Sequence, residues 1–180
     1  MACDHDCMAE PPKASRRGFL TRVALGGGAA LLSSLPLTAA RAAGHVDVLL
    51  LSCMDYRLMD EVAAYMQGRG LKDAYDHVIL AGASLGALTT RRPDWGRTFF
   101  EHLAVAIQLH HVKKVMVLDH RDCGAYRVFM GADAVKTPEA ETAVHARYLK
   151  LLRTQIRKRH PELEVELGLM ALDGTVETIS

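Results

Sequence analysis

The chain has 180 residues, of which 49% are hydrophobic and 24% are charged, and its formal net charge is +1. This composition is typical of a globular protein and argues against a collagen-like, disordered or strongly basic nucleic-acid-binding chain.

Residues 1–42 have the pattern of an export signal. The stretch SRRGFL at 15–20 places paired arginines before a glycine-rich apolar run, 23–37, which ends in the A-x-A pattern Ala40-Arg-Ala42. Paired arginines in this position indicate the twin-arginine route. The run has about 15 residues, against the roughly 20 that a membrane-spanning helix needs. We therefore expect cleavage near Ala42, a periplasmic or otherwise exported protein and no stable membrane span afterwards; the alternative is an uncleaved anchor.

The remaining residues, 43–180, are predicted to form one domain of nearly neutral charge. The chain has 22 basic and 21 acidic side chains, and residues 1–42 contain five of the basic and three of the acidic ones. Residues 43–180 therefore carry 17 basic and 18 acidic side chains. A nucleic-acid partner is therefore not indicated. Two cysteines, Cys53 and Cys123, lie in this domain. In an exported protein, a disulfide between them is one interpretation.

Strands and helices are predicted to alternate along the domain. Apolar runs predict strands over 46–52, 77–81, 115–118 and 164–170, with a loop over 82–86. Helical spacing predicts helices over 58–67, 94–111 with Asp94 as the cap, and 139–159. This order predicts an α/β fold of three layers, with a mostly parallel central sheet of about four strands flanked by helices.

Side chains that bind metals follow the first and third predicted strands. Cys53 and Asp55 come after the first, and His120 and Cys123 come after the third. Because the carboxyl ends of parallel strands meet at one sheet edge, we expect these side chains to lie together. Two cysteines and one histidine are a ligand set for Zn²⁺ that leaves the fourth tetrahedral position vacant, as in catalytic sites.

Asp55 and Arg57 add a second chemical function to the first strand end. Asp55 either takes the fourth metal position or accepts a hydrogen bond from the attacking hydroxide. A bidentate ion pair with Arg57 would hold Asp55 off the metal and keep it ionised. The sequence leaves both arrangements open.

Two motifs in the chain resemble the β-class carbonic anhydrases. They are C-x-D-x-R at residues 53–57, followed after a strand by Ala81-Gly82, and H-x-x-C-G at residues 120–124. The resemblance runs from about residue 46 to the end of the chain. It implies reversible hydration of carbon dioxide to bicarbonate by a homodimer or a larger homo-oligomer. The residues it implies are Cys53, His120 and Cys123 as Zn²⁺ ligands, Asp55 and Arg57 as a catalytic dyad, and Gly124 to permit the turn beneath the metal.

The predicted substrate pocket departs from the usual pattern of that family. The family usually has arginine and asparagine where this chain has Ile79 and Leu80, and Ala83 replaces a frequent asparagine. A pocket formed by Leu80, Gly82, Ala83 and Gly124 would be apolar and would suit a small nonpolar molecule. Carbonyl sulfide or carbon disulfide is therefore an alternative substrate, and a noncatalytic metal-binding or redox-responsive protein is an alternative function.

The other charged residues around the second motif are given no special role. Asp119, Arg121 and Asp122 are predicted to be ordinary loop charges. The basic side chains along residues 147–158 are interpreted as a solvated helix face.

Overall fold

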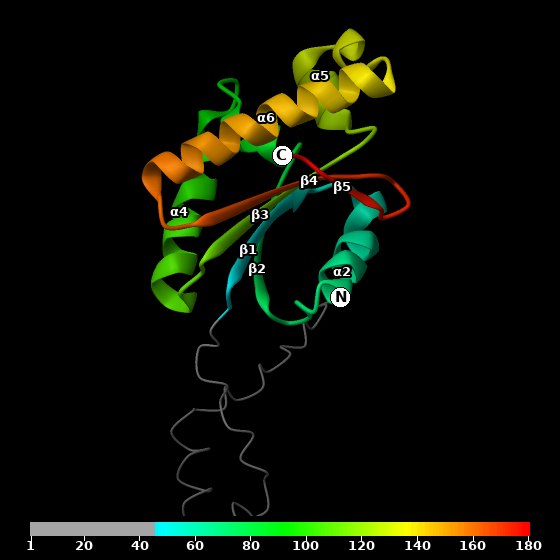
Figure 1. The fold of residues 1–180 in the computed structure, drawn as a ribbon. Coiled ribbons are helices and arrows are strands. Elements are labelled where there is room, and N and C mark those ends of the chain that lie inside the picture. Colours follow the sequence, from blue (N-terminus) through cyan, green and yellow to red (C-terminus); the bar gives the residue numbers. More distant parts are fainter. Residues whose placement is uncertain (1–45) are drawn as a thin grey trace, which may run out of the picture. The chain divides into compact units, whose positions relative to one another are not determined.

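The structure, a computed structural model, describes residues 46–180. Its centre is a five-stranded sheet with the strand order β2-β1-β3-β4-β5 (Figure 1). The first four strands are parallel, and β5 is antiparallel to β4. The predicted α/β fold is confirmed, with β5 in addition to the four predicted strands. The strands are β1 Val48–Cys53, β2 Tyr75–Leu80, β3 Lys114–His120, β4 Glu164–Met170 and β5 Val176–Thr178.

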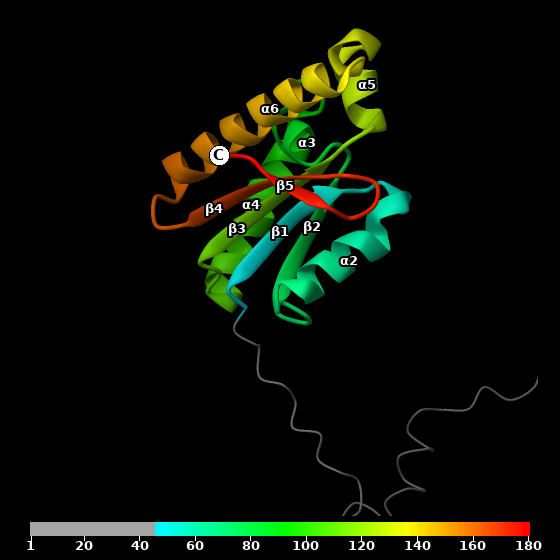
Figure 2. The ribbon, with the colours of Figure 1, turned by 45° about the vertical axis from the view of Figure 1, so that its right-hand side comes forward.

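Helices cover both faces of the sheet (Figure 2). Helix α2 packs on one face, around Val62 and Met66, and helices α3, α4 and α6 pack on the other, around Phe99 and Leu149. The sheet therefore has a separate hydrophobic core on each side, which gives the three layers. The helices are α2 Met59–Gly68, α3 Ser84–Leu88, α4 Pro93–His110, α5 Gly124–Met130 and α6 Pro138–Arg159, with short 3-10 turns η2 Tyr56–Leu58 and η3 Ala132–Val135.

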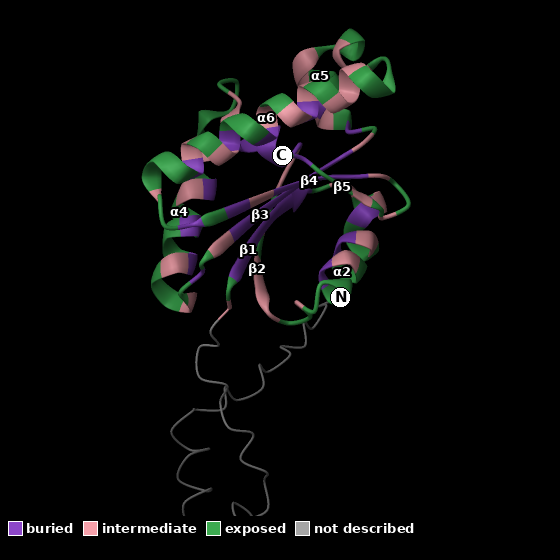
Figure 3. Cartoon of the chain, in the orientation of Figure 1, coloured by how far each residue is buried: buried purple, intermediate pink, exposed green. Residues whose placement is uncertain are grey.

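Strand β1 lies inside the sheet between β2 and β3, and all six of its residues are buried (Figure 3). Leu49 and Leu51 belong to the core under α4 and α6, whereas Val48 and Leu50 belong to the core under α2. A parallel strand covered on both faces must be apolar at successive positions, because both sets of alternating side chains leave water. Burial of β1 on both faces therefore explains the continuous apolar run in this part of the sequence.

The ends of the two long helices follow from local residue chemistry. Thr137 caps α6, because its side chain accepts a hydrogen bond from the backbone N–H of Ala140 at 3.2 Å. Pro93 is the first residue of α4, where its missing N–H costs no helical hydrogen bond. The prediction that Asp94 caps α4 is wrong: Arg92 is at the cap position, and Asp94 lies inside the first turn.

Helices α3 and α5 and strand β5 were not predicted, and α3 lies where a loop was expected. They have five, seven and three residues respectively. Elements this short do not repeat an apolar pattern often enough for its period to be recognised. Their positions depend on contacts with distant parts of the chain.

Gly86 lies where α3 packs against the end of β2. A Cβ atom added there would lie 2.5 Å from the carbonyl oxygen of Ala81 and 3.1 Å from Leu80 Cβ. Because backbone atoms cannot easily yield, Gly86→Ala is expected to lower the free energy of unfolding by about 1–3 kcal/mol. Gly68→Ala is the matched control, since a Cβ atom at this helical position meets nothing within 4 Å. Urea unfolding should show a loss for Gly86→Ala alone; equal stabilities of the two variants would contradict the packing.

Within residues 46–180, no helix combines the length and the apolar character that a membrane span requires. The predicted export signal, residues 1–42, lies outside the described residues. Cleavage near Ala42 and export therefore remain predictions.

Candidate metal centre

The two sequence motifs meet because β1 and β3 are neighbours in the sheet. The strands run parallel with Ser52 opposite Leu118, so Cys53 and His120 follow at the same sheet edge. Cys123 comes one short turn later, at the cap position of α5. One ligand atom from each of Cys53, His120 and Cys123 lies within 4.8 Å of the other two, and all three residues are buried.

The imidazole of His120 is oriented for metal binding. Its Nδ1 lies 2.8 Å from the carbonyl oxygen of Arg121, which accepts the Nδ1 proton. In the neutral ring Nε2 then carries the lone pair, and this buried atom has no hydrogen-bond partner among residues 46–180. A buried acceptor without a partner is costly unless a ligand occupies its lone pair. Two sulfur atoms and one such nitrogen are a donor set that fits Zn²⁺.

Both cysteines of the cluster are free thiols, with 3.9 Å between their sulfur atoms, so they do not form the alternative disulfide. Hydrogen bonding from the Cys123 thiol lowers the pKa of Cys53 despite burial, and His120 and the Gly82 N–H act in the same direction. Bonding to the Cys53 sulfur and burial raise the pKa of Cys123. One thiolate and one thiol are thus favoured, and a divalent cation would favour ionisation of both.

The carboxylate of Asp55 is held by Arg57 beside the cluster. Arg57 donates from Nε to Oδ1 at 2.9 Å and from Nη2 to Oδ2 at 2.8 Å. These bonds lower the pKa of Asp55 to about 2, so it stays ionised at neutral pH. Its Oδ2 lies 3.8 Å from Nε2 of His120. Of the two arrangements that the sequence left open, the structure has the bidentate ion pair.

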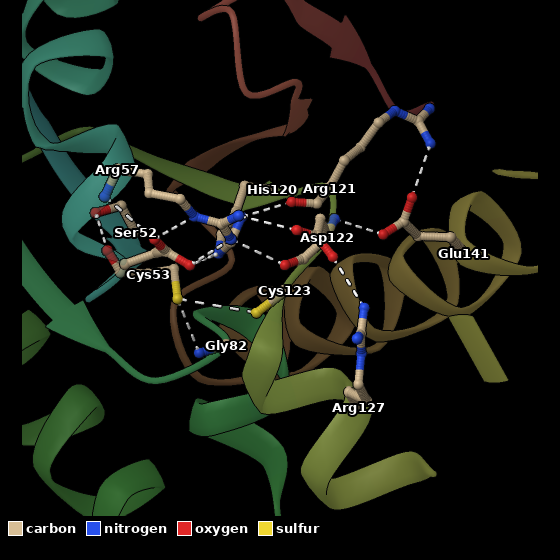
Figure 4. Close-up of polar contacts among 11 residues, drawn as sticks. Ser52, Cys53, Arg57, Gly82, His120, Arg121, Asp122, Cys123, Arg127 and Glu141 are labelled. Atoms are coloured by element: carbon tan, nitrogen blue, oxygen red, sulfur yellow. Dashed lines mark hydrogen bonds and ion pairs between the residues drawn. The ribbon is translucent and has the colours of Figure 1, made fainter. Parts of the chain in front are cut away.

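Asp122 anchors the other side of the Arg57 guanidinium (Figure 4). Arg57 donates from Nη1 to Oδ2 of Asp122 at 2.8 Å and from Nη2 to its carbonyl oxygen at 3.0 Å. The backbone N–H of Asp122 in turn donates to Oε1 of Glu141 at 2.6 Å, and Arg127 donates to Oδ1 of Asp122 at 2.9 Å. Asp122 thus lies in an exposed turn, as predicted, and in addition it positions the Arg57 guanidinium. No sequence pattern links it to Arg57 or Glu141, which lie far away along the chain.

A cavity of about 880 Å³ opens over the cluster. Cys53, Cys123, Asp55 and Arg57 all line it, whereas His120 is 2% exposed and is not among the lining residues. The cavity therefore brings the candidate ligands and the ion pair to one space. The rest of the wall is mainly apolar and includes Met54, Tyr56, Ala81, Ala125, Val128 and Phe129.

The residues predicted to form the substrate pocket lie in different places. Gly124 lines the cavity, but Leu80, Gly82 and Ala83 are not in its wall. Gly82 instead lies against the metal cluster, with its N–H 3.2 Å from Cys53 Sγ. The turn between His120 and Cys123 does not depend on Gly124, because the residue with left-handed backbone there is Asp122, at φ 54°.

For Asp119, in contrast, the prediction of a loop charge is wrong. It belongs to β3 and is 1% exposed. Its carboxylate contacts Ser84, Tyr126 and His145 through hydrogen bonds. Sequence reasoning missed it because its partners lie on three other elements.

A family model described as "Putative carbonic anhydrase" matches residues 44–160, about two thirds of the chain. The chain belongs to this family. Over 135 residues it is 42% identical to an uncharacterised protein of Rickettsia conorii, covering 75% of this chain and 73% of that one. It is 38% identical over 135 residues to an uncharacterised protein of Rickettsia bellii, covering 75% of this chain and 82% of that one.

Solved β-carbonic anhydrases share the fold. The enzyme from Trichomonas vaginalis gives a TM-score of 0.53 at 18% identity, over 92% of this chain and 98% of that chain. A tetrameric β-carbonic anhydrase from Sordaria macrospora gives a TM-score of 0.50 at 12% identity, over 92% of this chain and 87% of that chain. The resemblance stated from the two motifs is thus confirmed for the family and the fold.

Proposed function

We propose that the protein catalyses the reversible hydration of carbon dioxide to bicarbonate with a Zn²⁺ ion held by Cys53, His120 and Cys123. The observation that carries this proposal is the convergence of their three ligand atoms within 4.8 Å beside the Asp55–Arg57 pair. Membership of a carbonic anhydrase family supports the same reaction.

The metal and the side chains would divide the chemistry between them. A zinc ion in a three-ligand site acts as a Lewis acid and lowers the pKa of water from about 16 towards 7. Asp55, ionised and held by Arg57, would accept a hydrogen bond from the attacking oxygen and so orient its lone pair towards carbon dioxide. Arg57 keeps both Asp55 oxygens in place and is itself held by Asp122.

The cavity wall favours a small nonpolar substrate. Ala125, Val128 and Phe129 line the space next to the ligands. These apolar side chains would suit carbon dioxide, and they would also suit carbonyl sulfide or carbon disulfide. The replaced segment 79–83, which motivated a noncatalytic alternative, contributes only Ala81 to this wall. Hydrolysis of the sulfur analogues is therefore the second candidate, and kinetics with the three substrates side by side would separate the two.

We also propose that the protein is a homodimer or a larger homo-oligomer. The Sordaria enzyme is described as tetrameric. Met54, Tyr56 and Val128, which line the cavity, are 63%, 84% and 73% exposed, and a group of exposed apolar side chains would suit a contact with a second copy of the chain. The predicted twin-arginine export of the chain to the periplasm is retained as a further proposal.

Metal analysis and stopped-flow hydration of carbon dioxide test the proposed function on purified protein. We expect close to one zinc per chain and a turnover many orders of magnitude above that of free zinc. A full zinc content with turnover like that of free zinc would instead support a noncatalytic metal-binding protein. A zinc content far below one per chain would contradict the metal centre itself.

A further inference from the structure

Asp119, the residue before the candidate ligand His120 on β3, belongs to a buried group of four polar residues, the Asp119 quartet: Asp119, Ser84, Tyr126 and His145. Each is at most 1% exposed. Oδ1 of Asp119 accepts a hydrogen bond from the Ser84 N–H at 2.9 Å. Its Oδ2 accepts from the Ser84 hydroxyl at 2.7 Å, the Tyr126 hydroxyl at 2.7 Å and Nδ1 of His145 at 2.9 Å. Four donors offset the cost of burying the carboxylate, so the quartet ties β3, α3, α5 and α6 together.

Ser84 connects the quartet to an unusual turn. The turn contains two residues with left-handed backbone, Gly82 at φ 75° and Ala83 at φ 40°. Ala83 has a Cβ atom, so this conformation is unfavourable and must be held by its surroundings. The two hydrogen bonds from Ser84 to Asp119 come directly after it. In this conformation the Gly82 N–H donates to Cys53 Sγ at 3.2 Å (Figure 4).

The hydrogen bond from Gly82 acts directly on a candidate metal ligand. A donated N–H draws electron density from the thiolate of Cys53 and fixes the direction of its remaining lone pairs. Partners that orient ligands in this way commonly change metal affinity by about 10- to 100-fold when they are removed. The turn must therefore keep its shape for the charge density and the lone-pair direction of the Cys53 sulfur to stay fixed.

We propose that Asp119 is a positioning residue for the Cys53 ligand. Through Ser84 it holds the turn at Gly82 and Ala83 in the one conformation that directs the Gly82 N–H to the sulfur atom. This inference rests on the proposed zinc centre and adds to it a buried anchor on β3, one residue before the ligand His120.

Asp119→Asn in the full chain tests the inference with two readouts. The amide places a donor where Oδ2 accepts three hydrogen bonds, so the turn should loosen. We expect faster hydrogen exchange of the Gly82 amide, measured by NMR on metal-free protein. We also expect the sulfur-to-metal charge-transfer band of the Co²⁺-substituted protein to move to longer wavelength, and zinc affinity to fall by about tenfold or more. A loss of stability alone would leave the band unchanged.

Two further variants keep the inference testable. Ser84→Ala removes only the hydroxyl. It should speed Gly82 exchange and move the charge-transfer band in the same directions as Asp119→Asn, but by smaller amounts. This variant tests the inference if Asp119→Asn does not fold. Ser52→Ala is the matched control, because this buried hydroxyl bonds to His77 at 2.7 Å and to the backbone carbonyl oxygen of Cys53 at 3.4 Å, and not to the Cys53 sulfur or to the turn. Unchanged Gly82 exchange in the folded variants would overturn the inference. If the parent protein bound neither Co²⁺ nor zinc, the proposed function would fail, and exchange of Gly82 would still decide whether Asp119 holds the turn.

Discussion

Replacing Cys53 with alanine is expected to abolish stoichiometric zinc binding and, with it, hydration of carbon dioxide. Only Cys123 and His120 would then remain from the cluster whose ligand atoms lie within 4.8 Å. Each ligand of a protein zinc site supplies on the order of 3 kcal/mol, so affinity should fall by about two orders of magnitude or more. The thiol removed is also the one whose pKa is lowered by its neighbours, and so the better donor at neutral pH.

Zinc content after gel filtration and competition with a chelator measure this loss, and stopped-flow turnover measures its consequence. Ser52→Ala is the control on the same strand, because Ser52 is also buried and its hydroxyl bonds to His77 and to the backbone carbonyl oxygen of Cys53, not to a candidate ligand atom. It should retain both zinc and activity. Retention of one zinc per chain by Cys53→Ala would show that the metal binds elsewhere.

The ligands themselves could be predicted because their geometry follows from strand order. Once 46–52 and 115–118 are recognised as parallel strands, Cys53 and His120 must follow at the same edge, and Cys123 is one turn away. The central sheet follows from apolar runs in the same way. These inferences need only local periodicity and the rule for parallel strand ends.

The surroundings of the ligands could not be predicted, because they depend on burial and on distant partners. Asp119 and Asp122 look alike in the sequence, two acids within one motif. In the structure one lies in the core with four donors, and the other lies at the surface between Arg57 and Arg127. The difference is set by helices α3, α5 and α6, and the first two of these are too short to be recognised from sequence.

Asp55→Asn is expected to lower kcat/KM for hydration by about 10²- to 10⁴-fold while zinc stays bound, since a neutral amide is a weaker acceptor for the attacking oxygen. The side chain keeps its size, and Asp55 is not among the three candidate ligands. Asp60→Asn, an exposed acid on the neighbouring helix α2, should leave both quantities unchanged. Full activity of Asp55→Asn would remove Asp55 from the mechanism, and loss of zinc would make it a metal ligand.

The pH dependence of activity in Arg57→Gln distinguishes two roles for Arg57: orienting the Asp55 carboxylate or keeping it ionised. The Arg57 guanidinium depresses the pKa of Asp55 to about 2, so the stabilisation it provides is present above the ordinary carboxyl pKa and is lost as pH falls towards 2. In Arg57→Gln the pKa of Asp55 should rise towards its ordinary value near 3.8, which still leaves it ionised at neutral pH. If Arg57 acts by holding the carboxylate in place, the variant should lose activity equally at pH 7 and pH 9. A ratio of variant to parent activity that rises between pH 5 and pH 8 would mean that Arg57 acts mainly by keeping Asp55 charged.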